Sequence, residues 1–162
     1  MKTITIKNPW AYLICSGEKN IENRTWPTKF RGRVLVHASA KPIVVKNPKN
    51  VFTYAQFESL SIDQRLLVKS TYLTNSAIIG SVEIVDCTVN HESIWAEKSE
   101  GVMAGSTFYH KESDKLIWNW VLANPVLFAK PILNVKGRLS FWEYPMTEEE
   151  YLNQIKAGNS AR

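Results

Sequence analysis

Residues 17–24, Gly-Glu-Lys-Asn-Ile-Glu-Asn-Arg, join the end of a predicted helix to a predicted strand. Gly17 favours the left-handed backbone conformation that ends a helix, because it has no side chain to clash. In a strand, Glu22 and Arg24 stand two residues apart and therefore share a face. Lys19 lies at the bend before them. The segment thus predicts two positive charges and one negative charge in a small region of the fold.

The residues before and after this segment predict the first elements. Thr3 to Ile6 alternates polar and apolar side chains, which indicates a short strand. Asn8 suits the N-cap of a helix, and Pro9 suits its first position, where the missing N–H costs nothing. Two further strands and a loop rich in proline, asparagine and lysine follow, at 21–26, 33–38 and 41–50.

The rest of the chain continues this mixture of short strands and helices. Thr147 followed by Glu150 is a capping-box pattern for a C-terminal helix. One or two helices are predicted within 53–68, strands at 77–89, 117–121 and 135–144, and a turn or break at Asn124-Pro125. Gly80 marks a bulge or a close backbone approach, and 98–113 has the least ordered composition. Short strands outnumber helices, so we expect an α+β fold: a small mixed β-barrel or half-barrel with flanking α-helices.

Charge is distributed unevenly along the chain. The formal net charge of the 162 residues is +5, with 20 Lys and Arg against 15 Asp and Glu. Residues 1–50 hold ten of these bases and two of the acids, a net charge of +8. Such an excess predicts a basic surface and an anionic partner such as nucleic acid, provided that the residues converge in the fold. The alternative is a scatter of solvated charges.

Composition also indicates the number of domains, the state of the cysteines and the expected location of the protein. A length of 162 residues suits one domain, with 44% hydrophobic and 22% charged residues. Cys15 and Cys87 are far apart in apolar surroundings, which favours buried free thiols over a disulfide. No apolar run reaches the length of a membrane span, and the N-terminus lacks the apolar region of a signal peptide. We therefore expect a cytoplasmic protein with no membrane partner.

The segment 17–24 matches the pattern G-x-K-x-x-E-x-R and resembles the ASCH domains, a PUA-like family. Five other stretches resemble the same family in the same order: Pro9-Trp10, RGRVLVHAS at 31–39, GSVEIVD at 80–86, WNWVLANP at 118–125 and PILNVKGRLSFW at 131–142. The resemblance runs through most of residues 4–144. It implies a PUA-like pseudobarrel, within a single domain over 1–162 whose residues 145–162 form a C-terminal helix and tail.

The resemblance also implies a cleft beside the first helix that binds RNA, single-stranded nucleic acid or a nucleotide-like small molecule. In such a cleft, Arg24 could grip phosphate bidentately and Lys19 could donate to phosphate or base. Glu22 could orient Arg24 or accept from a base amine. The alternative is a structural Glu–Arg pair with Lys19 solvated.

Neighbouring residues extend this candidate binding site. Trp26 is the candidate for base stacking, although burial is an equal alternative for it. His37 at a strand end could contact phosphate or serve as a structural histidine. The remaining candidates are polar or basic and lie close in sequence: Thr25, Arg31, Arg33 and Ser39. No histidine has a cysteine or carboxylate at metal-ligand spacing, so we predict no metal site, and we expect no cofactor.

An enzymatic alternative follows from the same residues. Some ASCH proteins resemble ribonucleases or acetylcytidine amidohydrolases, and in the latter a threonine nucleophile follows the lysine by three positions. Here that position is Glu22, and Thr25 stands at another offset. Lys19 and Glu22 could instead act as a catalytic acid–base pair on RNA, without metal. The sequence therefore leaves binding and hydrolysis as two hypotheses.

Overall fold

The computed structural model of the chain describes residues 1–159. The chain runs through strands and helices in the order β1 (Lys2–Ile6), α1 (Trp10–Cys15), β2 (Ile21–Arg24), β3 (Gly32–Ala38), a 3-10 turn η1 (Pro48–Asn50), α2 (Tyr54–Ser59), α3 (Ile62–Lys69), β4 (Ala77–Thr88), β5 (Val102–Ala104), β6 (Thr107–Tyr109), β7 (Trp118–Ile132), β8 (Phe141–Glu143) and α4 (Glu148–Asn159). The predicted C-terminal tail at 160–162 lies outside the described residues.

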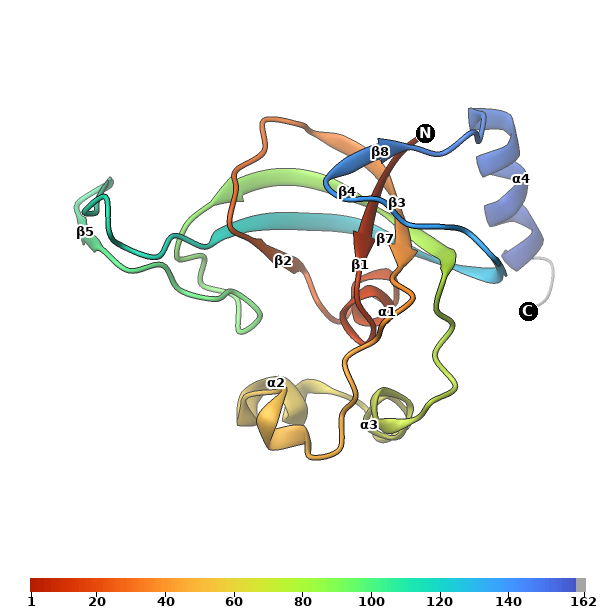
Figure 1. Cartoon of the computed structure of the whole chain (residues 1–162), viewed down its shortest axis with the longest axis horizontal. Coiled ribbons are helices and arrows are strands. Elements are labelled where there is room, and N and C mark those ends of the chain that lie inside the picture. The colour runs from red at the N-terminus through yellow and green to blue at the C-terminus, as the bar shows by residue number, and fades with distance from the viewer. Residues whose placement is uncertain (160–162) are drawn as a thin grey trace.

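Six strands form one curled sheet in the order β2-β7-β4-β3-β1-β8 (Figure 1). β1 pairs with β3 in parallel, and every other pair in this sheet is antiparallel. Helix α1 packs against the sheet through Ala11, Ile14 and Cys15, which join the same core cluster as Val36 and Trp120. The expected fold class, an α+β mixed half-barrel with flanking helices, is confirmed.

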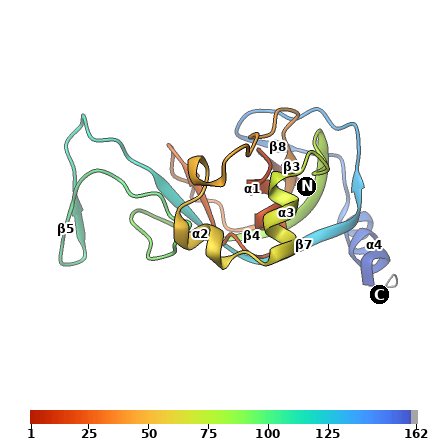
Figure 2. The ribbon, with the colours of Figure 1, turned by 90° about the horizontal axis from the view of Figure 1, so that it is seen from below.

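Helices α2 and α3 lie over α1 on the side opposite the sheet (Figure 2). Both begin with capping boxes, at Thr53 and Ser61, which satisfy the free backbone N–H groups of their first turns. The segments around them bury a second apolar cluster that includes Leu13, Phe52 and Trp95. This cluster brings the loops around Phe52 and Trp95 next to α1 and therefore next to the end of that helix, where residues 17–24 begin.

The start of α1 differs from the prediction by one residue. Trp10 is the first helical residue and Pro9 occupies the N-cap position. The side chain of Asn8 still satisfies a free donor, because its Oδ1 accepts from the backbone N–H of Tyr12 at 3.1 Å. Gly17 ends the helix with a φ of +92°, as its position predicts.

The predicted turn or break at Asn124-Pro125 does not end the strand, because β7 continues through it to Ile132. The β4–β7 register shifts near this dipeptide, and Asn124 has a φ of +49°. An irregularity in the ladder accommodates Pro125, which has no N–H to donate. Gly80 fulfils its prediction: a Cβ there would lie 2.1 Å from Val126 O and 2.8 Å from the buried Cys15 Sγ.

Two segments were predicted less well. The stretch 98–113 contains a hairpin of β5 and β6, which forms an arm on the side of the molecule opposite α4 (Figure 1). Only Phe141–Glu143 (β8) of the predicted strand at 135–144 form a strand, and Leu139 is 94% exposed on the loop before them. Asn134 and Ser140 both have positive φ values, which are incompatible with a continuous extended strand through this loop. Among residues 1–159, no helix has the length and apolarity needed to cross a membrane.

Candidate nucleotide-binding cleft

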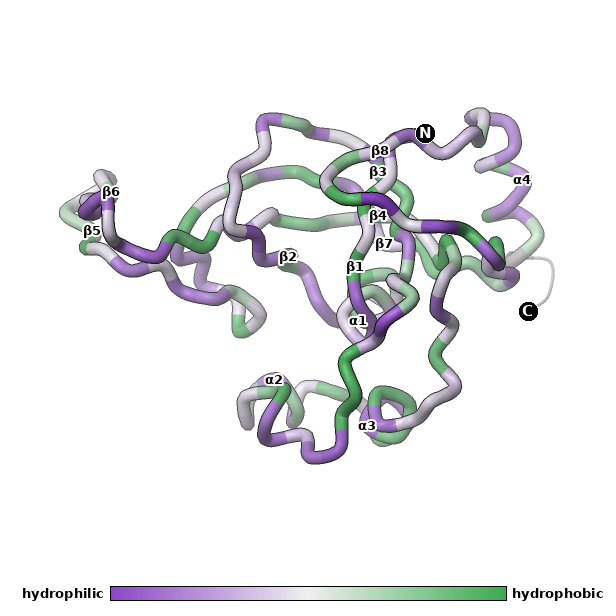
Figure 3. The backbone as a smooth tube through the Cα atoms, viewed as in Figure 1, coloured by the Kyte–Doolittle hydropathy of each residue, from purple (hydrophilic) through white to green (hydrophobic). Residues whose placement is uncertain are grey.

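Three charged side chains meet where α1 gives way to β2. Gly17 turns the chain, and the backbone N–H of Lys19 then donates to Leu13 O at 2.9 Å, which holds this residue against the end of α1. β2 follows at once and pairs with β7, placing Glu22 opposite Trp120. In Figure 3 this strand appears as a hydrophilic segment beside the more hydrophobic β7. The strand thus brings charged side chains to the edge of the sheet.

Glu22 lies at the centre of this cluster. Its Oε1 is 2.9 Å from Arg24 Nε, and its Oε2 is 3.6 Å from Lys19 Nζ. The side chains of Lys19 and Glu22 are only 5% and 11% exposed, against 24% for Arg24. Lys19 Nζ also donates to Ile21 O, and Arg24 Nη2 donates to Thr5 O at 2.9 Å. The carboxylate is therefore held in a fixed position by two cations.

Burial changes the proton affinity of Lys19. Removal from water lowers the pKa of its ammonium group, while the nearby Glu22 carboxylate opposes that effect. The ammonium lies 5.7 Å from the centre of the Trp10 ring, which adds a cation–π contact. The Glu97 carboxylate also acts on Lys19, so the charges of the cluster are nearly balanced.

A pocket of about 540 Å³ opens beside Lys19 and Glu22. Trp10, Phe52 and Trp95 supply aromatic surface to it, with Trp10 packed edge-on against Phe52 at 5.0 Å and against Trp95 at 6.2 Å. The other lining residues are polar or lie on the neighbouring loop: Asn23, Lys49, Asn50, Val51, Thr53, Gln56 and Glu97. An aromatic wall with a few fixed polar groups is typical of a small-molecule pocket, and the volume suits a nucleotide.

A second pocket of about 350 Å³ adjoins the first. Trp10, Glu22 and Asn23 line both, so the two form one cleft with the carboxylate between them. The second pocket adds basic and polar groups from four parts of the chain: Lys7, Arg24, Ser39 and Arg138.

The sequence matches the ASCH domain family over residues 4–132. The chain belongs to the ASCH domain family. It is similar to Activating signal cointegrator 1 of Homo sapiens, 29% identical over 84 residues, and of Mus musculus, 27% identical over 84 residues. Each alignment covers 52% of this chain and 14% of the relative, so the chain spans a small part of those proteins. The curled sheet with its helices is consistent with the PUA-like pseudobarrel that the resemblance implies.

Two predicted site residues lie away from the cleft of this ASCH domain. Arg31 Nη2 pairs with Asp86 Oδ1 at 3.1 Å, and Arg33 Nη2 pairs with Glu83 Oε1 at 2.8 Å. Arg33 stands opposite Glu83 in the β3–β4 ladder, which explains its partner. The structure therefore does not bring these arginines to Lys19, and the basic residues of the N-terminal third do not all converge.

The structure separates the other four predicted residues. Thr25 is exposed beyond the end of β2, and Trp26 packs edge-on against Trp120 with ring centres 4.6 Å apart. Trp26 is thus partly buried against the core cluster and does not line the cleft. His37 is buried and its Nε2–H donates to Val135 O at 2.8 Å, whereas Ser39 reaches the second pocket of the cleft.

Several cleft residues were missed by sequence reasoning. The sequence analysis did not assign Trp10, Phe52, Trp95 or Lys49 to the site. Phe52 and Trp95 lie on loops before α2 and after β4, and the second apolar cluster brings them to Trp10. The sequence signal of Phe52 and Trp95 was a large aromatic residue near polar neighbours. Within residues 1–159, no group of three or more His, Cys, Asp or Glu side chains is arranged to hold a metal ion.

Proposed function

We propose that this ASCH domain binds RNA or another single-stranded nucleic acid and holds one nucleotide in the cleft. The observation that carries the proposal is the Glu22 carboxylate, fixed by Lys19 and Arg24 beside the half-buried ring of Trp10. Every base has a π-face that can pack on an aromatic ring, so this contact tolerates any sequence.

Each group of the cleft then has a distinct task. Glu22 can accept a hydrogen bond from an exocyclic base amine, as carboxylates do from cytosine. Arg24 also donates a hydrogen bond to Thr5 O, which orients its guanidinium group beside the Glu22 carboxylate. Lys49 is exposed at the first pocket, and its ammonium has no partner among the described residues, so it is available to a phosphate. The net charge of +8 in residues 1–50 supports an anionic ligand.

Fluorescence anisotropy with a labelled single-stranded RNA at several salt concentrations tests this proposal. We expect affinity to fall with salt, because each phosphate contact releases counterions. Lys49→Ala should weaken binding by about fivefold at 0.1 M salt, the effect of one lost contact on a single strand. Lys46→Ala is the matched control, since Lys46 is equally exposed three residues away and lines neither pocket of the cleft. Absence of binding at low salt, or an affinity independent of salt, would contradict the proposal.

A metal-independent hydrolase of RNA or of acetylcytidine is the second candidate function. The observation in its favour is the buried Lys19, whose lowered pKa increases the fraction of neutral amine, 3.6 Å from Glu22. Incubation of the protein with RNA and with acetylcytidine, beside the Lys19→Met variant, tests it. Turnover that Lys19→Met abolishes would support hydrolysis, and equal turnover by both proteins would reject the role of Lys19.

A further inference from the structure

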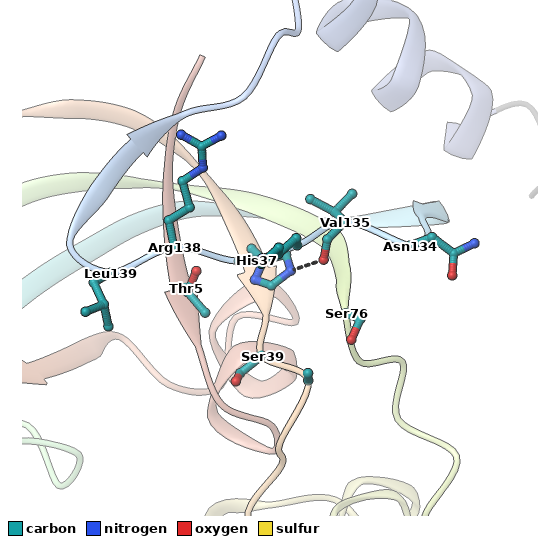
Figure 4. Close-up of a pocket in the computed structure, with 11 residues that line it drawn as sticks. Thr5, His37, Ser39, Ser76, Asn134, Val135, Arg138 and Leu139 are labelled. Carbon is teal, nitrogen blue, oxygen red and sulfur yellow. Dashed lines mark hydrogen bonds between the residues drawn. The ribbon is translucent and has the colours of Figure 1, made fainter.

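A third pocket, of about 600 Å³, lies beyond Ser39 at the end of β1 and β3 (Figure 4). Thr5, Ser39, Arg138 and Leu139 line both this pocket and the neighbouring pocket of the cleft. The surface is therefore continuous from the aromatic wall, past Glu22, to the loop at 133–140. A ligand longer than one nucleotide has a path along it.

The third pocket is basic and rich in hydroxyl groups. Among its lining residues, all of them described, none is acidic, and Lys136 and Arg138 supply two cations. Both side chains are exposed, and neither has a hydrogen bond or ion pair with any residue of the described chain. Figure 4 shows the hydroxyls of Ser39 and Ser76 on one side of the loop, and the Arg138 guanidinium extending from its other side. Unpaired cations on a loop that borders a hydroxyl-lined pocket can hold an anionic strand at its rim.

The loop that carries the cations is anchored to the sheet. Val135 N donates to Ser76 O at 2.8 Å, and Val135 O accepts from the buried His37 ring. Gly137 lies so close to this ring that a Cβ would be 2.5 Å from His37 Cε1. These contacts fix the backbone on both sides of Lys136 and next to Arg138. The cations thus stand on a backbone that is already in place, which lowers the entropy cost of binding.

We propose that the third pocket is a phosphate subsite for the same nucleic-acid strand whose base occupies the cleft. The ligand is then a single-stranded polynucleotide with at least one further phosphodiester, and not a free nucleotide. The inference rests on the proposed function and extends it. Lys136 and Arg138 lie beyond residue 132, where the family match ends, within the stretch 131–142 that resembles the family.

The test compares a labelled 12-nucleotide single-stranded RNA with a labelled mononucleotide, both measured by anisotropy. The Lys136→Ala/Arg138→Ala variant should bind the RNA about 5-fold to 25-fold more weakly at 0.1 M salt, for one or two lost phosphate contacts. The slope of log affinity against log salt should fall by about 0.7 to 1.4. Lys136→Ala alone changes a residue that lines the third pocket and neither pocket of the cleft, so its affinity for the mononucleotide should equal that of the wild type. DNA of the same sequence should show the same loss, because the subsite contacts phosphate.

Lys29→Ala/Lys130→Ala is the control for net charge, since both lysines are exposed and line none of the three pockets. Two results would reject the subsite while the cleft proposal stands. In the first, the Lys29→Ala/Lys130→Ala control weakens RNA binding as much as Lys136→Ala/Arg138→Ala does. In the second, Lys136→Ala/Arg138→Ala binds RNA like the wild type. Equal weakening of RNA and mononucleotide binding by Lys136→Ala would also reject the subsite. If Lys49→Ala leaves RNA affinity unchanged and the wild type does not bind the mononucleotide, while Lys136→Ala/Arg138→Ala lowers RNA affinity, the cleft proposal fails although the loop still contacts RNA.

Discussion

Glu22 is the residue on which the charged cluster depends. Its two oxygens face Lys19 and Arg24, and the Lys19 side chain is almost fully buried. A buried ammonium without a carboxylate would lose its compensating charge, whereas Arg24 reaches water and would lose less. The same three residues thus connect the turn between α1 and β2 to the pocket beside it.

Glu22→Gln should lower the free energy of unfolding by about 3 kcal/mol, because it leaves the charge of Lys19 buried and unpaired. The Lys19→Met/Glu22→Gln variant removes that charge as well, and we expect it to be more stable than Glu22→Gln. Urea unfolding followed by circular dichroism measures both. If the loss of stability in Lys19→Met/Glu22→Gln equals the sum of the losses in Lys19→Met and Glu22→Gln, the two side chains are not coupled.

His37 should make stability depend on pH below neutrality. Burial lowers the pKa of its imidazole from the usual 6.5, although the hydrogen bond to Val135 O opposes this. The unfolded chain therefore binds more protons, and the contribution of neutral His37 is complete above pH 6.5 and is lost as pH falls through the folded pKa. Urea unfolding at pH 7.5 and 5.0 should show a smaller loss for His37→Gln than for the wild type. An equal loss would assign the dependence to other groups.

At the scale of elements, the contact between β4 and α1 sets how tightly the sheet closes on its helix. Gly80 in β4 faces Val126 O in β7 and the side chain of Cys15 in α1. Burial raises the pKa of the Cys15 thiol far above its usual range, so this thiol stays neutral in the core. Three elements therefore meet at a position that has no space for a methyl group.

Gly80→Ala should lower the free energy of unfolding by about 3 kcal/mol, since the added Cβ would overlap backbone that cannot move freely. Gly105→Ala is the comparison, because nothing lies within 4 Å of a Cβ there and only its positive φ of 64° resists the change. We expect about 1 kcal/mol for Gly105→Ala. Thermal unfolding of both variants gives the values, and equal losses would exclude close packing at Gly80.

At the scale of the whole molecule, the half-barrel carries its helices and its arm on separate sides. α4 joins the sheet through Tyr151, whose Oη is 2.8 Å from Ser81 Oγ and whose ring packs near Phe128. The arm is closed at its base by Glu100 and Lys115, with Glu100 N donating to Lys115 O at 2.9 Å. Residues of the arm line none of the three pockets of the cleft and subsite.

Replacing residues 101–114 by a short Gly-Ser linker should therefore leave the half-barrel folded. We expect the free energy of unfolding to change by less than about 1 kcal/mol, because the arm adds few buried groups to the core. RNA affinity should also stay within twofold of the wild type. Loss of a cooperative unfolding transition in the shortened protein would show instead that the arm stabilises the sheet.

Local signals were sufficient for much of the fold. Gly17, the capping box of Thr147 and Glu150, and the alternation in β1 act within one or two turns of chain, so the sequence predicted those elements. The class of a mixed half-barrel followed from the number and order of the short strands. Asn124-Pro125 misled because a ladder irregularity, formed only against β4, accommodates the proline.

The sequence by itself determined that Lys19, Glu22 and Arg24 lie together, because they are neighbours across one turn and one strand. Only the tertiary structure decided their surroundings. It placed Trp10 and Trp95 beside them through a shared apolar cluster, directed Arg33 to Glu83 by strand register, and anchored the Lys136 and Arg138 loop on His37. These contacts join residues far apart in the chain, and their free energy arises from packing and pairing that no local pattern records.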